Sequence, residues 1–185
     1  MPILDLETTI YPPNLLEDPA AREGERCWWV LYTKSRQEKA VARQLLSWTV
    51  PFYLPLVANT HVIRGRAVDS YTPVFNGYVF LFGDPFDRVQ SLKTNRISRV
   101  LEVVDQEQLT HDLRDIARLI ASDAPLTIER QLTAGQRVRI KTGSLAGVEG
   151  VVIERRGRNR LLVAVNFLQQ GVSMAIDDYQ LELLR

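Results

Sequence analysis

The chain has 185 residues, of which 45% are hydrophobic and 24% charged, and its net charge is +1. This length fits one medium and one small domain, with an apolar core that needs neither disulfides nor metal. A single cysteine, Cys27, excludes an internal disulfide framework and any multi-cysteine metal site. Because no apolar run could span a bilayer and no signal peptide is evident, we expect a cytoplasmic protein that does not bind membranes.

The charge is distributed unevenly along the chain. Residues 1–26 carry six acidic and two basic side chains and four prolines, without a helical or strand period, which predicts a flexible acidic leader. Residues 27–100 carry ten basic and four acidic side chains. Such a surplus can guide a chain toward nucleic acid, although it also occurs on ordinary solvated surfaces.

The first elements after the leader are a strand and a helix. Residues 28–32 are aromatic and β-branched, which predicts a strand. Ser35 and Glu38 have the spacing of a capping box, and Val41 and Leu45 continue at helical spacing to about residue 48. Residues 52–57 then predict a short strand region, and residues 61–68 a hairpin with Gly65 at its tip.

The next segments complete the first domain, which we expect over residues 27–122. Residues 76–82 form the most apolar run and predict a buried strand entered through a turn. A short helix follows with Asp84 as its cap and Pro85 in its first position, and its apolar residues are expected to face inward: Phe86, Val89 and Leu92. A strand over 100–104, a helix over 105–122 and a linker over 123–132 come next.

The last segment, residues 133–185, predicts a small β domain. Val138 and Ile140 alternate with cations, and Gly143, Gly147 and Gly150 supply positions for tight turns and close backbone approach. Further strands are expected over 161–167 and 172–176. The unit from 135 to 153 resembles the KOW motif, an SH3-like barrel of transcription elongation factors and some ribosomal proteins, which implies a binding module.

Residues 27–185 together resemble the NusG family of transcription elongation and antitermination factors. The most specific segments are 28–34, 75–80 and 135–153. The resemblance implies an α+β fold, in which an N-terminal antiparallel sheet flanked by helices is followed by a small SH3-like β-barrel. The acidic leader, the hairpin near Gly65 and the lack of a His-Thr-Thr stretch near residues 90–92 indicate a specialised, RfaH-like paralogue.

The resemblance also implies partners and the residues that contact them. The first domain of this family docks through an apolar depression onto the clamp helices of the largest RNA polymerase subunit, and the matching positions are Tyr32, Phe75, Tyr78 and Phe80. Without the resemblance, these aromatics would be interpreted as sheet core. The KOW turn and its surroundings, at Leu145, Val148 and Phe167, would contact the ribosomal small-subunit protein or Rho.

A basic set is the candidate for contact with the non-template strand or the upstream DNA duplex, where phosphate contacts add affinity without reading sequence. A solvated charged surface is an almost equally good interpretation of these residues. The set comprises Lys34, Arg36, Arg43, Arg64, Arg66, Arg96 and Arg99.

No constellation of residues predicts an enzyme, a metal site or a cofactor. The leading interpretation is a factor that binds RNA polymerase at the clamp and suppresses pausing or termination, with the KOW domain recruiting a partner. The alternative is a KOW-type RNA- or ribosome-binding protein. Its phosphate contacts would be Arg155, Arg156, Arg158 and Arg160.

Overall fold

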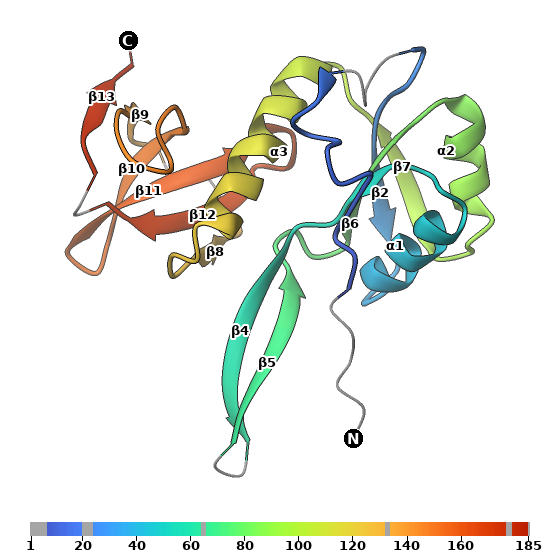
Figure 1. Cartoon of the computed structure of the whole chain (residues 1–185), viewed down its shortest axis with the longest axis horizontal. Coiled ribbons are helices and arrows are strands. Elements are labelled where there is room, and N and C mark those ends of the chain that lie inside the picture. Colours follow the sequence, from blue (N-terminus) through green and yellow to red (C-terminus); the bar gives the residue numbers. More distant parts are fainter. Residues whose placement is uncertain (1–6, 20–23, 64–65, 132–133, 177–178, 185) are drawn as a thin grey trace. The chain divides into compact units, whose positions relative to one another are not determined.

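The computed structural model describes residues 7–19, 24–63, 66–131, 134–176 and 179–184, apart from the side chains of 60–63, 66 and 68. The chain divides into two compact units, Met1–Gln106 (unit 1) and Glu107–Arg185 (unit 2) (Figure 1). This division differs from the domain boundaries expected from the sequence, because it groups the helix after residue 105 with the C-terminal strands. None of the helices in the described ranges is both long and apolar enough to cross a membrane.

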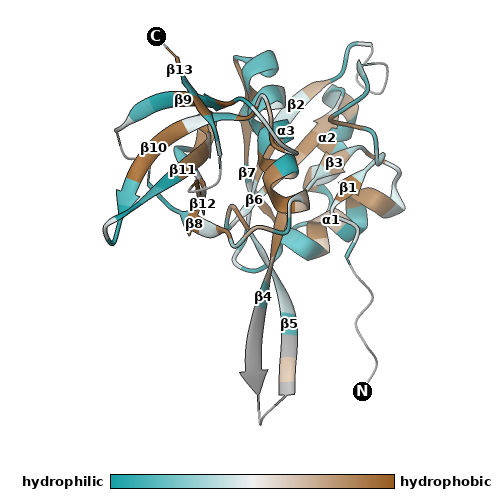
Figure 2. Ribbon diagram, turned by 60° about the vertical axis from the view of Figure 1, so that its left-hand side comes forward, coloured by the Kyte–Doolittle hydropathy of each residue, from teal (hydrophilic) through white to brown (hydrophobic). Residues whose placement is uncertain are grey.

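Unit 1 is built on a five-stranded antiparallel sheet with the strand order β1-β3-β6-β2-β7. Its strands are β1 (Ile10–Tyr11), β2 (Cys27–Thr33), β3 (Phe52–Tyr53), β6 (Tyr78–Gly83) and β7 (Ile97–Glu102). The two central strands, β2 and β6, pair from Cys27 opposite Gly83 to Tyr32 opposite Tyr78. Strand β6 is hydrophobic (Figure 2), and all of its residues except Tyr78 are buried, as the sequence predicts.

Alternation along the central strands separates two packed faces of the sheet. On one face, Leu31 and Leu81 pack with Leu45 of helix α1 (Glu38–Ser47). On the other, the rings of Trp28 and Phe82 meet edge to face, with centroids 5.1 Å apart. Helix α1 therefore contributes a buried stripe to the core and leaves its opposite side to the surface.

Residues 10–16 are packed against the rest of unit 1, in contrast to the flexible leader expected there. Ile10 and Tyr11 pair with Tyr53 and Phe52 across β1 and β3. Leu15 and Leu16 are almost completely buried, at 0% and 2% exposure. Composition alone misses this packing because the strand that β1 pairs with lies some forty residues further along the chain.

The two short helices of unit 1 begin differently. The capping box expected at Ser35 and Glu38 is wrong: Gln37 is the N-cap and makes no side-chain cap bond. The Glu38 carboxylate instead accepts a hydrogen bond of 2.6 Å from the Gly77 N–H. The cap of helix α2 (Pro85–Leu92) is as expected at Asp84, which exchanges hydrogen bonds with Asp87 in a capping box.

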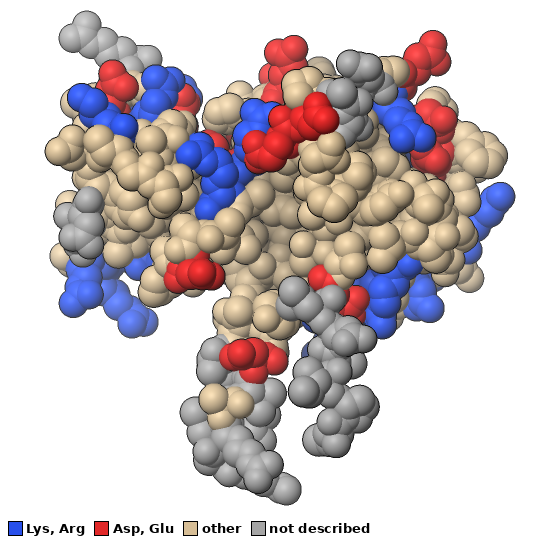
Figure 3. Space-filling model, viewed as in Figure 1, with Lys and Arg blue, Asp and Glu red and all other residues tan. Residues whose placement is uncertain are grey.

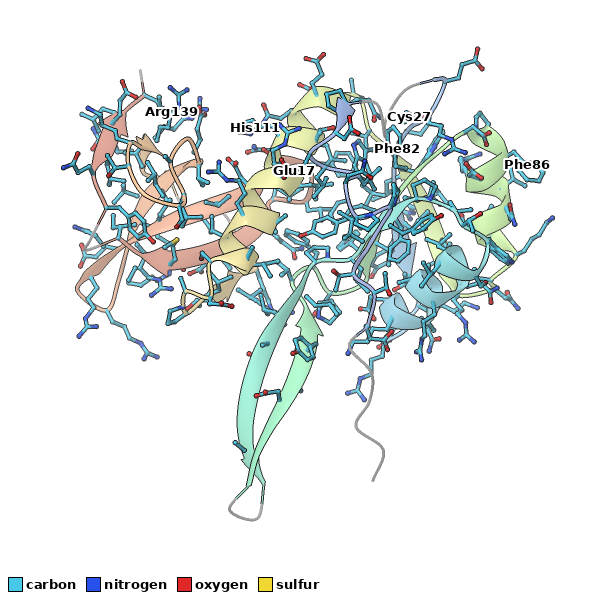
Figure 4. The ribbon with its side chains drawn as sticks, viewed as in Figure 1. Glu17, Cys27, Phe82, Phe86, His111 and Arg139 are labelled. Atoms are coloured by element: carbon cyan, nitrogen blue, oxygen red, sulfur yellow. The ribbon has the colours of Figure 1, made fainter. Side chains whose placement is uncertain are left out.

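Helix α2 does not turn its apolar residues inward, so that expectation is wrong. Phe86 is 68% exposed and projects away from the helix (Figure 4), and Val89 and Leu92 are also exposed. The side of the helix that is buried carries Asp87 and Ser91 instead. A spacing of three residues defines an apolar stripe, but it does not determine which side of a short helix meets the sheet.

A separate two-stranded sheet joins β3 to β6. Strands β4 (Leu56–Ile63) and β5 (Arg66–Pro73) pair in antiparallel register from Leu56 opposite Pro73 to Ile63 opposite Arg66. The expected hairpin is therefore present and longer than the sequence indicates. Its expected tip at Gly65 lies outside the described residues.

Unit 2 begins with helix α3 (Gln106–Ala121), all but the first residue of which belongs to the unit, and continues as an antiparallel sheet with the order β13-β9-β10-β11-β12-β8. Its strands are β8 (Thr127–Glu129), β9 (Gln136–Ile140), β10 (Glu149–Arg155), β11 (Arg158–Val165), β12 (Gln170–Ala175) and β13 (Leu181–Leu183). Val138 and Ile140 of β9 are buried, as their alternation predicts. The expected fold class, an antiparallel sheet flanked by helices followed by a β-rich unit, is confirmed.

Polar side chains of α3 form hydrogen bonds to backbone groups elsewhere in unit 2. The Asp112 carboxylate accepts a hydrogen bond of 2.9 Å from the Asn166 N–H, and Asp115 accepts one of 3.2 Å from the Glu149 N–H. Arg118 donates to the Ala146 carbonyl at 2.7 Å. These bonds fix both the position and the rotation of the helix, because each one is directional.

The carboxylates of Asp112 and Asp115 are both partly removed from water, which disfavours their charged forms. Burial raises the pKa of Asp112, and hydrogen bonds from Asn166 and Gln108 oppose that rise. Burial likewise raises the pKa of Asp115, against the hydrogen bond from the Glu149 N–H and the charge of His111. Desolvation therefore outweighs the favourable hydrogen bonds at both positions.

Stability should thus fall with rising pH through the titration of Asp112. A carboxylate whose pKa is raised on folding binds its proton more tightly in the folded state, so its contribution is complete below the unfolded pKa of about 4 and is lost as pH rises through the folded pKa. We expect the unfolding free energy of the wild type minus that of Asp112→Asn to decrease over this window, measured by urea denaturation. A difference that rises with pH would contradict this assignment.

Candidate functional site

A hollow of about 660 Å³ opens in unit 1 beside the end of β2 and the first turns of α1. We call it the Tyr32 hollow. Tyr32 and Tyr71 contribute aromatic rings to its lining, and Arg36, Lys39 and Arg43 contribute cations. Aromatic faces beside positive charge are suited to binding an anionic or mixed polar and apolar partner.

Tyr32 is held in place by its strand partner and by a glycine turn. Its ring lies 5.2 Å from that of Tyr78, centroid to centroid, at an interplanar angle of 41°. A Cβ on Gly77, whose φ is +84°, would come within 3.0 Å of the Tyr32 ring. Because Glu38 also accepts the Gly77 N–H, the turn is fixed between the end of β2 and the start of α1.

The four aromatics expected to form a docking surface occupy two environments. Tyr32 is 43% exposed and Tyr78 is partly exposed. Phe75 and Phe80 are 1% and 0% exposed, and their rings meet edge to face in the core. Only the two tyrosines are therefore available for contact in this conformation, and the burial of the phenylalanines differs from their expected surface position.

The hollow has a row of cations that the sequence only partly indicated. Lys39 and Arg43 lie on α1, and Arg36 lies just before the helix with a φ of 58°; all three line the hollow. Arg43 also lies 3.8 Å from the Glu7 carboxylate. Lys39 was not among the residues predicted from the sequence, although its spacing from Arg36 and Arg43 could have indicated it. Tyr71 could not be foreseen, because it lines the hollow only as a result of where the fold places β5.

The other expected nucleic-acid residues do not line the hollow. Lys34 donates to the Asn95 carbonyl at 2.8 Å, and Arg96 donates to the Gln37 side chain. Arg99 lies opposite Tyr32 across β2 and β7, and its side chain is exposed. Arg64 and the side chain of Arg66 lie outside the described residues.

In unit 2, the expected KOW contact residues also divide between core and surface. Leu145 and Val148 are 1% and 0% exposed, so they stabilise the turn from within. Phe167, in the 3-10 turn Asn166–Leu168, is 39% exposed. Of the three expected contact residues, Phe167 is therefore the one that reaches the surface.

Two features of the described residues bear on reactivity: the protonation state of the Cys27 thiol and the grouping of side chains that could ligate a metal. Burial raises the pKa of the Cys27 thiol and the charge of Glu102 adds to that rise, so the thiol is protonated at neutral pH and is a poor nucleophile. Among residues with described positions, no three His, Cys, Asp or Glu side chains gather as metal ligands.

The sequence matches one protein-family model over more than half of its length. The family model described as transcription termination factor NusG matches residues 26–132. The chain belongs to the NusG family. Proteins of this family are transcription factors without enzymatic activity, they bind RNA polymerase, and the match gives this member a role in transcription elongation.

Solved structures and curated proteins add little to this NusG-family assignment. A structure described as "Domain interaction in Thermotoga maritima NusG" is 17% identical, with a TM-score of 0.49, and covers 84% of this chain and 96% of that one. A structure described as "MjSpt4:Spt5 complex conformation B" is 14% identical, with a TM-score of 0.28, over 85% and 98% of the two chains. A search of curated proteins found no match.

The contact between Gly77 and Tyr32 predicts a specific effect of Gly77→Ala. The positive φ should destabilise the variant by about 1 to 2 kcal/mol, and the new methyl group should also displace the Tyr32 ring. Gly143→Ala is the matched control, because Gly143 has a φ of +87° and nothing within 4 Å of its Cβ position. Ring resonances of Tyr32 and Tyr78 should shift in the first variant only, and unchanged resonances in Gly77→Ala would exclude the contact.

Proposed function

We propose that this chain binds RNA polymerase at the clamp helices of the largest subunit and suppresses pausing or termination. The observation that supports this most directly is the exposed pair Tyr32 and Tyr78, which lies at the end of the two central strands within the family match. A tyrosine ring combines a large apolar area with a polar tip, which favours its use at protein interfaces. The docking surface thus narrows to these two residues, with Phe75 and Phe80 supporting it from the core.

Beside the docking pair, the cations of the Tyr32 hollow are proposed to contact the non-template strand or the upstream duplex. Arg36, Lys39 and Arg43 form one row, and Lys34, Arg96 and Arg99 extend the positive charge beyond the hollow. Contacts of this kind add affinity through counterion release without reading the sequence. DNA held in this way would keep the factor oriented on the polymerase.

No chemical step is needed for the proposed effect on pausing. A factor that binds the active clamp state more tightly than the paused state shifts the equilibrium between them by its difference in affinity. We further propose that unit 2 is a KOW domain that recruits a partner, the ribosomal small-subunit protein or Rho, through the surface at Phe167. The long β4–β5 hairpin supports a specialised, RfaH-like paralogue acting in the cytoplasm.

Loss of the tyrosine pair should weaken polymerase binding. Burying an aromatic side chain contributes about 1.5 to 3 kcal/mol, so Tyr32→Ala and Tyr78→Ala should each reduce affinity by roughly tenfold or more. Val104→Ala is the matched control, because Val104 is apolar and 98% exposed. Affinity is to be measured by surface plasmon resonance on immobilised core polymerase, and melting curves verify that the variants are folded. Unchanged affinity in folded variants would exclude this docking surface.

Loss of the cationic row should act on pausing more than on docking. In the triple variant Arg36→Ala, Lys39→Ala and Arg43→Ala, we expect polymerase affinity within a few-fold of wild type and longer pauses on a defined template. The difference in pause lifetime should shrink as salt concentration rises. Lys93→Ala, which removes an exposed cation of the same unit, should leave pausing unchanged. Equal pause lifetimes for the triple variant and the wild type would show that these three cations are solvated surface charges without a role in pausing.

A further inference from the structure

The turn between β10 and β11 gathers four arginines within six residues. Arg156 and Gly157 form a two-residue connection and both have positive φ, of 53° and 72°, which is the conformation of a tight hairpin turn. Arg155 and Arg158 lie directly opposite each other across the hairpin, and Arg160 lies opposite Ile153. We call Arg155–Arg160 the arginine hairpin.

The like-charged pair at the base of this turn is unfavourable in the free protein, because like charges directly opposite each other repel. A carboxylate on β8 offsets part of this repulsion. Glu129, which is 8% exposed, lies 3.4 Å from the Arg155 guanidinium. Arg155 therefore has a carboxylate partner, whereas Arg158 on the opposite strand is exposed to solvent.

Two of the arginines are anchored and two are presented to solvent. Arg160 donates to the Ser173 hydroxyl at 2.9 Å and to the Ser173 carbonyl, while the same hydroxyl donates to Glu129 at 2.8 Å. Arg156 and Arg158 are exposed, and neither makes a side-chain hydrogen bond or ion pair within the described part of the chain. Lys and Arg atoms gather at this end of the β-rich unit in Figure 3.

Beside the hairpin lies a hollow of about 700 Å³ lined by Thr127, Glu129 and the four arginines. All six lining residues are polar, so the hollow offers no aromatic ring for base stacking and no apolar anchor for a protein partner. Guanidinium groups match phosphate oxygens in geometry and charge. We propose that the arginine hairpin binds the phosphodiester backbone of nucleic acid without reading its sequence.

A polymer fits this surface better than a small phosphate compound does. The two free cations lie at an exposed tip, where a single small anion would stay hydrated and gain little. A phosphodiester chain instead contacts several cations at once, and each contact releases counterions. Binding at the arginine hairpin would not require docking to polymerase, because none of the residues of the hairpin belongs to the Tyr32 hollow.

The test uses the full-length protein, labelled with ¹⁵N and titrated with a 20-base-pair RNA hairpin or a DNA duplex of the same sequence. The amide resonances of Arg156, Gly157 and Arg158 should shift when either polymer binds. The affinities for RNA and for DNA are then compared to establish which of the two the hairpin prefers. Fluorescence anisotropy of the labelled nucleic acid then gives affinity as a function of salt. Shift changes confined to unit 1 would overturn the proposal.

The decisive variant is Arg156→Ala with Arg158→Ala, which removes the two cations without disturbing the Glu129 network. We expect about tenfold weaker binding at 50 mM salt and a salt slope shallower by roughly 1.8, as for the loss of two phosphate contacts on a duplex. Lys93→Ala with Lys141→Ala removes the same charge from exposed positions elsewhere and should change neither quantity. Equal effects of the two double variants, or shifts at the hairpin caused by poly-glutamate and not by nucleic acid, would overturn the proposal.

Discussion

The pairing of β2 with β6 is the constraint on which unit 1 depends. Its register places Trp28 opposite Phe82 at one end and Tyr32 opposite Tyr78 at the other. Because side chains alternate between faces, a slip of one residue would exchange the packed faces of the central strand. The same register therefore determines which apolar residues meet α1 and brings the two tyrosines together where the strands reach the surface.

Unit 2 is stabilised by a different kind of contact at its helix. Leu113 and Ile116 of α3 are fully buried, but apolar packing alone would allow the helix to rotate or slide. Asp112, Asp115 and Arg118 bond to backbone groups of the loops, and buried polar groups that are satisfied in one arrangement only disfavour the others. Burial raises the pKa of both carboxylates, so fixing the helix in one position carries a cost in desolvation.

The sequence predicted features that depend on local chemistry and missed those that depend on distant partners. Asp84 and Pro85 start a helix through neighbouring atoms, so the α2 cap could be foreseen. Glu38 has the spacing of a cap but bonds to Gly77, thirty-nine residues away, and no local pattern reveals such a partner. For the same reason, the resemblance points to the aromatics of β6 and its turn as one set, but only the fold shows which of them reach the surface.

The two cationic surfaces differ in a way that bears on how each would bind. In the Tyr32 hollow, the cations of α1 stand beside aromatic rings, so a ligand there can gain stacking and apolar burial as well as charge. At the arginine hairpin, the lining is entirely polar and charge is the only source of affinity. The first surface can therefore distinguish partners by shape and should keep part of its affinity at high salt. The second would hold any phosphate backbone weakly and release it readily, which would suit a contact that moves along a polymer.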